Sequence, residues 1–184
     1  MAIITLNNRA TNRSDTASAG QVFTATSATA ADFQAGGGTN TPAFEAELSA
    51  NQSVSNNTWT KVAFNTEIFD TDSSYNNSTY RFQPQTAGKY MLYTVITHGF
   101  NNNTGMSGRV QPYKNGSTMR RTSQLNVYND AEFTSTAITL SLVVDLNGSS
   151  DYMEIFALGE GTSPVFRGDG TVGSSVFGAY KIIT

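Results

Sequence analysis

The sequence predicts an all-β fold, a sandwich or jelly roll preceded by an extended N-terminal arm. Aromatic residues make up 11% of the 184 residues and charged residues only 14%. With abundant glycine, asparagine, serine and threonine, this balance favours strands and turns over helices. After residue 41, about eight short apolar runs follow one another between turn signals, without a convincing helix. The length suffices for one main core, which buries roughly 70% of the unfolded surface.

Composition also excludes several classes of partner. The chain has no cysteine, which excludes disulfides and thiolate metal sites. Its net charge of -3 offers no basic field for the phosphates of a nucleic acid. The opening Met1–Leu6 lacks the positive flank and the long apolar stretch of a signal peptide or membrane span. We therefore expect a soluble protein with neither nucleic-acid nor membrane partners.

Residues 1–41 differ in character from residues 42–184, and we divide the chain into an arm and a body at this point. Large apolar residues in the arm are few and scattered, too few for a core of its own. Ser27–Gln34 is expected to form one or two helical turns that end at Gly36–Gly38. Gly36–Pro42 has the composition of a hinge between arm and body.

Two interpretations of the arm stay open. It is either a flexible leader or a segment that becomes ordered by lying on the surface of another protein. In the second interpretation, apolar anchors and polar contacts to that surface come from Ile3, Leu6, Phe23 and Phe33, and from Arg9, Arg13 and Asp15.

The body begins with two expected strands. Phe44–Leu48 alternates apolar with acidic residues, which predicts a strand with one face exposed to water. Trp59–Phe64 predicts a second strand, with a short continuation at Ile68–Phe69. Asn51–Asn57 and Asp70–Ser78 are rich in asparagine, serine and aspartate, so we expect loops there.

The stretch Tyr80–Thr97 is the centre of the body. Tyr80–Phe82 leads into a corner at Pro84–Gly88, because proline cannot donate to a sheet ladder and glycine accepts backbone angles that other residues avoid. The aromatic and β-branched run Tyr90–Ile96 then predicts a long, buried central strand.

A turn and a hairpin follow the central strand. Asn101–Gly105 is expected to turn the chain, and Arg109–Tyr113 to continue as a strand. Pro112 indicates an edge position or a bulge in that strand. Asn115-Gly116 predicts a tight hairpin turn, because Asn-Gly suits a turn with positive φ at both central residues. A polar strand over Met119–Val127 should follow.

The last third repeats this pattern. Ala137–Val144 is apolar at both alternating sets of positions, so we expect both faces of this strand to be covered. Asn147-Gly148 predicts a second tight turn, and Tyr152–Leu158 a returning strand. Gly159–Ser174 is expected to be a long loop before a final strand at Val176–Ile183.

A specific family resemblance lies at these positions. Seven residues match in order and spacing the signature of the C1q-like globular domain, a jelly roll related to tumour necrosis factor: Phe64, Asp70, Tyr75, Phe82, Gly88, Tyr90 and Leu92. The pattern departs from the family where Leu92 replaces the usual phenylalanine and where Thr94 replaces an aromatic residue. Val110–Gly116 resembles the family's apolar strand ending in Lys-Asn-Gly, and Ser174–Tyr180 its closing strand, although Ala179 differs.

The resemblance covers residues 42–184 and implies a C1q/TNF-like jelly roll. It also implies a homotrimer about a threefold axis through one sheet face. The residues expected in the fold core or the trimer core are Phe64, Phe82, Gly88, Tyr90, Leu92, Phe177 and Gly178.

The arm carries a second resemblance. Asn7–Thr29 is similar to the leaders of C1q-like structural proteins of tailed phages. Collagen repeats usually precede this domain in animal proteins and are absent from the sequence, which favours a virion protein over a complement or cytokine role. We expect a trimeric decoration (cement) protein on the capsid surface, held by its arm to the major capsid protein or another virion protein. The alternative is a receptor- or host-glycan-binding module of a head or tail fibre.

Catalytic and metal sites are not expected. His98 is the only histidine, and every triad with a histidine base would need it; we expect a structural or solvated role. Asp70–Ser74 begins like a calcium loop, but Tyr75 and Arg81 stand where such a loop requires glycine and glutamate. The acids that lack any motif, and are expected on the surface, are Glu45, Glu47, Glu67, Asp70 and Asp72. The sequence therefore predicts neither an enzyme nor a cofactor.

Two further features have competing interpretations. Arg167-Gly168-Asp169 spells an integrin-binding tripeptide in an expected exposed loop, and we interpret it as a chance match. Tyr75 and Tyr128 near loops are candidates to stack on sugars, although cores and trimer interfaces need aromatic residues too.

Overall fold

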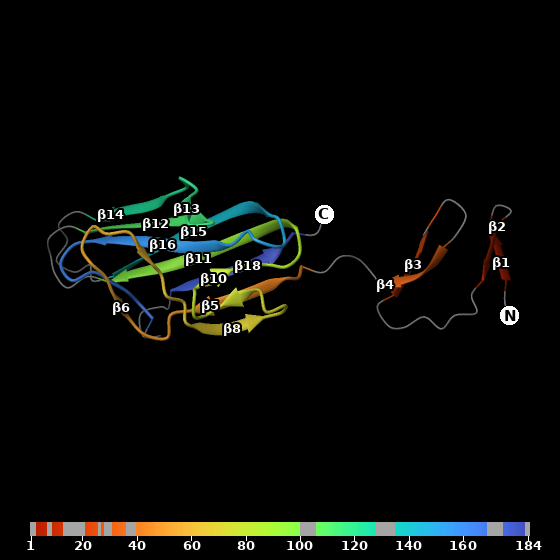
Figure 1. Cartoon of the computed structure of the whole chain (residues 1–184), viewed down its shortest axis with the longest axis horizontal. Coiled ribbons are helices and arrows are strands. Elements are labelled where there is room, and N and C mark those ends of the chain that lie inside the picture. Colours follow the sequence, from red (N-terminus) through yellow and green to blue (C-terminus); the bar gives the residue numbers. More distant parts are fainter. Residues whose placement is uncertain are drawn as a thin grey trace. The chain divides into compact units, whose positions relative to one another are not determined.

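The computed structural model describes residues 3–6, 9–12, 21–25, 27, 31–35, 40–99, 106–127, 135–168 and 175–182. The chain divides into two compact units, Met1–Thr39 and Asn40–Thr184. Every regular element in the described ranges is a β-strand (Figure 1). The described residues include no helix long and apolar enough to cross a membrane.

The described part of the first unit consists of two antiparallel hairpins. β1 (Ile3–Leu6) pairs with β2 (Arg9–Asn12), and β3 (Gln21–Ala25) pairs with β4 (Ala31–Ala35). The helical turns expected over Ser27–Gln34 are therefore wrong. A helix this short has a costly nucleus, whereas the ladder from Gln21↔Ala35 to Ala25↔Ala31 satisfies backbone groups on both segments.

The body is a sandwich of two antiparallel sheets, and β11 is the central strand of the first. β11 pairs along its whole length with β15 on one edge, and with β18 and β17 on the other. The sheet order is β6-β17-β11-β18-β5-β8, with β15 also on β11. Its strands are β5 (Ala43–Glu47), β6 (Gln52–Ser53), β8 (Thr66–Asp70), β11 (Gly88–Gly99), β15 (Ser135–Leu146), β17 (Val165–Phe166) and β18 (Val176–Lys181).

The second sheet is built around β12 and β16. Its order is β13-β12-β16-β10-β9, with β14 also on β12 and β7 also on β16. Its strands are β7 (Thr60–Lys61), β9 (Tyr75–Asn76), β10 (Arg81–Phe82), β12 (Met106–Lys114), β13 (Ser117–Thr118), β14 (Ser123–Val127) and β16 (Met153–Glu160). Several of these strands are only two residues long.

An aromatic cluster joins the two sheets. The ring of Phe44 on β5 stacks on Tyr75 with centroids 4.6 Å apart and on Phe82 with centroids 4.7 Å apart. It also meets the edge of Phe177 on β18 at 5.0 Å. Aromatic pairs in these geometries contribute beyond the area they bury. The all-β sandwich predicted from sequence is confirmed, because residues of both sheets share one core.

Several expected elements are shorter than predicted. The strand expected over Trp59–Phe64 is reduced to β7, while the expected loops over Asn51–Asn57, Asp70–Ser78 and Gly159–Ser174 contain β6, β9 and β17. Of the strand expected over Met119–Val127, only Ser123–Val127 forms, as β14. These short pairs form with strands distant in sequence, such as β17 with β6, so local composition does not mark them.

The hairpin at Asn115-Gly116 is confirmed, with φ of 53° and 75° at its two central residues. Pro112, in contrast, does not lie on an edge strand, since β12 pairs with β16 on one side and with β13 and β14 on the other. Proline is tolerated there because the outer strand is interrupted between Thr118 and Ser123. Across this gap the Pro112 carbonyl accepts a hydrogen bond from Met119 N at 3.1 Å.

β15 has only one covered face within the body, so the expectation of two is wrong for the single chain. Ile138, Leu142, Val144 and Leu146 are buried, whereas Val143 between them is 46% exposed. The buried residues face the second sheet. The other face carries Ala137, Thr139, Ser141 and Val143, and it meets no further layer among the described residues.

Candidate functional site

The expected arm contacts fall on the two hairpins. Ile3 and Leu6 lie at the two ends of β1, and Arg9 begins β2. Phe23 and Phe33 are direct partners in the β3–β4 ladder. Val22 and Phe23 are 50% and 44% exposed. Arg13 and Asp15 lie outside the described residues.

The expected core residues lie between the two sheets of the body. Phe64, Phe82, Tyr90, Leu92 and Phe177 are fully buried. The two departures from the family pattern are also accounted for, because Leu92 fills the core and Thr94 donates its hydroxyl to the Val176 carbonyl at 2.7 Å.

Two glycines of the expected core permit close approaches. A Cβ at Gly178 would lie 2.3 Å from Cζ of Tyr93, so only glycine leaves room for that ring. Gly88 has φ of +153° and packs against the stem of Lys181.

Asp70 caps the turn of its own loop. Its Oδ1 accepts hydrogen bonds from the Ser74 backbone N and Oγ, both at 3.1 Å, and from Asp72 N at 3.4 Å. Its Oδ2 accepts from Tyr75 N at 2.8 Å. The carboxylate is thus directed at donors of its own loop. Within the described ranges no three histidine, aspartate or glutamate side chains group as a metal site.

His98 is a fully buried residue of the core. Its Nδ1 donates to the Ile96 carbonyl at 3.3 Å, and its ring meets Phe166 edge-on at 5.3 Å. Burial lowers the pKa of His98 to about 4, so the ring is neutral at pH 7. A side chain enclosed in this way cannot reach a substrate as a catalytic base.

The outward face of the first sheet carries an apolar strip, which we call the open sheet face: Met91, Tyr93, Val143 and Tyr180. Met91 lies opposite Val143 on β15 and opposite Tyr180 on β18, so the three side chains share one face. Val143 is 46% and Tyr180 37% exposed. Tyr93 donates its hydroxyl to Glu45 Oε2 at 2.6 Å. Sequence analysis missed this strip, because its residues come from three strands that are distant in the sequence.

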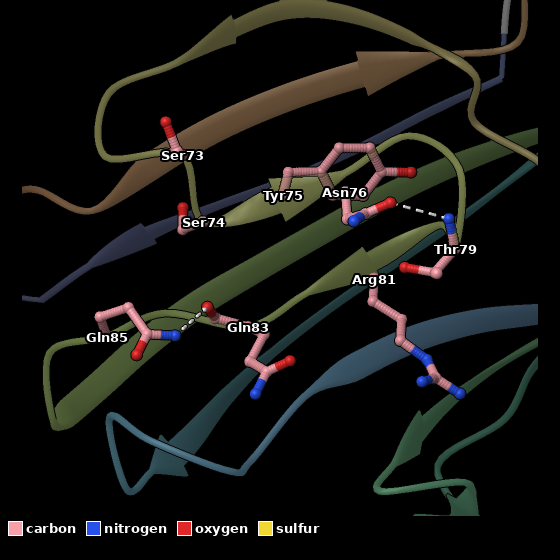
Figure 2. A pocket seen from close by; sticks show the side chains of 8 residues that line it. All are labelled: Ser73, Ser74, Tyr75, Asn76, Thr79, Arg81, Gln83 and Gln85. Carbon is pink, nitrogen blue, oxygen red and sulfur yellow. Dashed lines mark hydrogen bonds between the residues drawn. The ribbon is translucent and has the colours of Figure 1, made fainter.

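A polar surface pocket of about 310 Å³ lies on the β9–β10 side of the body (Figure 2). All its lining residues come from one continuous segment: Ser73, Ser74, Tyr75, Asn76, Thr79, Arg81, Gln83 and Gln85. Sequence analysis missed this pocket, since the lining has no motif and was assigned mostly to a loop.

Tyr75 contributes no exposed ring, because it is 5% exposed and donates its hydroxyl to the Phe64 carbonyl at 2.7 Å. Of the two interpretations of Tyr75, the structure favours the core role over stacking on sugars; Tyr128 lies outside the described residues.

A charged cluster borders the pocket. Glu154 is nearly buried, with a side chain 3% exposed, and its Oε1 accepts from both Arg81 Nε and Lys61 Nζ at 2.9 Å. The Arg81 guanidinium also lies 4.1 Å above the ring of Tyr152. A buried carboxylate is tolerated when it is paired and hydrogen-bonded in this way. The cluster fixes the position of Arg81 at the pocket wall.

The tripeptide Arg167-Gly168-Asp169 does not form the fully exposed loop that was expected. Gly168 is buried, and its backbone N donates to Asn51 Oδ1 at 3.1 Å. A Cβ at this position would lie 2.5 Å from the Leu48 Cβ. Asp169 lies outside the described residues. The surroundings of Gly168 are those of a packed strand end.

Comparison with known proteins agrees with this architecture. The family model described as C1q domain matches residues 43–156. None of the curated proteins compared with the chain matches it.

Solved structures share the fold at low sequence identity. The globular domain of zebrafish complement 1qA protein is 14% identical in sequence. The match covers 77% of this chain and 97% of the zebrafish domain, with a TM-score of 0.52. Murine APRIL at pH 5.0 is 13% identical, with coverage of 76% and 98% and a TM-score of 0.53. Eiger TNF from S. frugiperda is 12% identical, with coverage of 76% and 91% and a TM-score of 0.55. With more than half of its residues matched by the family model and its two sheets arranged as in these structures, the chain belongs to the C1q domain family.

Proposed function

We propose that this chain is a trimeric structural protein of a tailed-phage virion, which decorates the capsid surface and is attached to it through its N-terminal unit. The observation that carries the proposal is the contrast between the two units. The body buries a core shared by two sheets, whereas the described part of the first unit holds only two-stranded hairpins. Isolated two-stranded hairpins are marginally stable in water, so a partner surface would stabilise them.

The open sheet face supports the trimer in this proposal. Val143 and Tyr180 are large side chains left exposed on the two strands that flank β11, and Met91 lies in the same row. Exposed apolar strips on a sheet face are typical of surfaces that another subunit covers. The exposed ion pair of Lys89 with Asp145 at 2.7 Å lies two residues from Met91 and Val143 on their strands and would form part of the rim.

Attachment through the first unit has two physical advantages. The edges of β1–β2 and β3–β4 can add strands to a capsid-protein edge by backbone hydrogen bonds, with Ile3, Leu6, Phe23 and Phe33 as apolar anchors. Three arms on one trimer would raise the avidity above that of a single arm. The similarity of Asn7–Thr29 to phage leaders favours attachment to a virion.

The test of attachment uses capsids that lack the protein. The full chain is expected to co-sediment with them, and a variant whose residues 1–39 are replaced by a Gly/Ser segment of equal length is expected not to. Equal melting temperatures of the body in the full chain and in the Gly/Ser variant serve as the control for folding. Retained attachment of the Gly/Ser variant would contradict the proposal.

Receptor binding is the second candidate function, and the polar pocket favours it. A module that contacts the host through loops of a rigid sandwich would carry such a recess. Particles with and without the protein separate the two functions. A decoration role predicts a loss of resistance to heat and osmotic shock, whereas a receptor role predicts a loss of adsorption to host cells. Neither role requires catalysis, and the enclosed His98 supports a protein that is not an enzyme.

A further inference from the structure

We infer that the pocket lined by residues 73–85 binds an uncharged saccharide. This inference gives a site and a ligand class to the second candidate function, and it rests on that function. The volume of about 310 Å³ is at the lower end of the range for small-molecule sites, which suits one or two sugar rings. The pocket lies on the body, so its binding is measured separately from capsid attachment.

The first argument is that the lining is fixed before any ligand arrives. Asn76 Oδ1 accepts from the backbone N of Ser78 and of Thr79, both at 2.9 Å, and one of these bonds is drawn in Figure 2. Gln83 Nε2 donates to the Ser149 carbonyl at 2.9 Å, and Gln83 N donates to the Ser74 carbonyl at 2.7 Å. A lining held by such bonds loses little freedom on binding.

The second argument is the set of hydrogen-bonding groups that stays available. The bonds above use Oδ1 of Asn76 and Nε2 of Gln83, so the Asn76 amide NH₂ and the Gln83 Oε1 have no partner among the described residues. Gln85 uses its Nε2 in a weak 3.3 Å bond to the Gln83 carbonyl and likewise keeps its Oε1. The hydroxyls of Ser73 and Thr79 can both donate and accept. Sugar hydroxyls are themselves donors and acceptors, and they match a mixed set of this kind.

The third argument concerns charge. Arg81 is the one charged residue of the lining, and its Nε donates to Glu154 Oε1 at 2.9 Å. No residue of the lining therefore carries an unpaired charge that would attract an ion. The two glutamine oxygens would repel an anion, and Arg81 would repel a cation. An uncharged ligand is therefore favoured.

The test is an array of neutral and anionic oligosaccharides probed with the full chain, followed by titration calorimetry with the strongest neutral binder. The double variant Thr79→Val/Gln85→Met removes one hydroxyl and one amide while keeping the size of each side chain. Two lost hydrogen bonds should weaken binding roughly tenfold or more. The matched control is Gln124→Met on β14, an exposed glutamine away from the pocket, which should bind as the unmodified chain does.

Three results would overturn the inference. An array without any binder, neutral or anionic, overturns the ligand class, while the adsorption of particles to host cells still tests the receptor function. Binding to sulfated or sialylated sugars alone contradicts the charge argument. Neutral binding that survives Thr79→Val/Gln85→Met in a correctly folded protein places the site elsewhere and leaves the receptor function standing.

Discussion

Asp70 shows how a single residue positions much of this body. Its carboxylate accepts four hydrogen bonds from the turn that leads into Tyr75. Tyr75 in turn stacks on Phe44 and bonds to the Phe64 carbonyl. The spacing of Phe64, Asp70 and Tyr75 in the family signature therefore reflects one connected arrangement of a ring, a cap and a second ring.

Replacing this cap should be costly. We expect Asp70→Ala to lower the free energy of unfolding by about 2 kcal/mol or more, because several backbone and side-chain donors lose their acceptor. Asp72→Ala is the matched control, since Asp72 Oδ2 accepts only from the hydroxyl of Thr71, at 3.2 Å. Urea unfolding of both variants measures the difference. Equal effects of the two substitutions would contradict the role of Asp70.

His98 should make the body less stable in mild acid. Burial lowers the pKa of the folded ring to about 4, while the unfolded ring keeps a pKa of roughly 6.5. Between these values the unfolded chain binds a proton that the folded chain does not. Stability from this group is therefore complete above about pH 6.5 and falls as the pH decreases towards 4, by about 3 kcal/mol in all.

The measurement for His98 is urea unfolding at pH 7 and pH 4.5 for the unmodified chain and for His98→Gln. The carboxylates titrate alike in both proteins, so the difference between the two pH dependences reports the imidazole. We expect the variant to lose less stability on acidification. Parallel pH dependences would show that the histidine is not protected from protonation.

At the scale of elements, position within a sheet decides how much each strand contributes. β16 lies inside the second sheet and pairs with β12, β10 and β7, and its Ile155 is 2% exposed. β8 is an edge strand of the first sheet, bonded only to β5, and its Ile68 is 52% exposed. The two isoleucines are chemically identical and differ in what surrounds them.

This contrast gives a matched pair of substitutions. Ile155→Ala should lower the free energy of unfolding by about 2–5 kcal/mol. The variant loses the free energy gained by burying the removed apolar atoms, and it leaves a cavity in the core. Ile68→Ala should change it by less than about 1 kcal/mol. Chemical denaturation of the two variants is the measurement. Comparable losses would mean that β8 is covered in solution, for example by another subunit.

At the scale of the whole molecule, the open sheet face decides the oligomeric state that we propose. We expect the unmodified chain to sediment as a trimer and Val143→Lys to sediment as a monomer, because a lysine charge in an apolar interface loses its hydration. Leu125→Lys is the control, since Leu125 is also exposed, at 38%, but lies on β14 of the other sheet. A monomeric unmodified chain, or a trimer that tolerates Val143→Lys, would contradict the proposed face.

Much of the fold could be predicted from the sequence. The alternation at Phe44–Leu48, the run Tyr90–Ile96 and the turn at Asn115-Gly116 each act through neighbours a few residues away, so their local pattern is sufficient. The signature from Phe64 to Tyr90 added the family and the jelly roll, because its aromatic residues form the core that joins the sheets.

Tertiary structure alone decided the candidate sites. The short strands β6, β9 and β17 exist only through partners distant in sequence, and the hairpin β3–β4 replaced an expected helical turn for the same reason. The smaller and more polar residues of β15, such as Thr139 and Ser141, mark its exposed side, but only strand pairing places Val143 beside Met91 and Tyr180. The polar pocket arose where β9, β10 and their turns bring eight residues of ordinary composition together. Sequence determines which residues prefer strands and burial, whereas the pairing of distant strands determines which face is covered and where a recess forms.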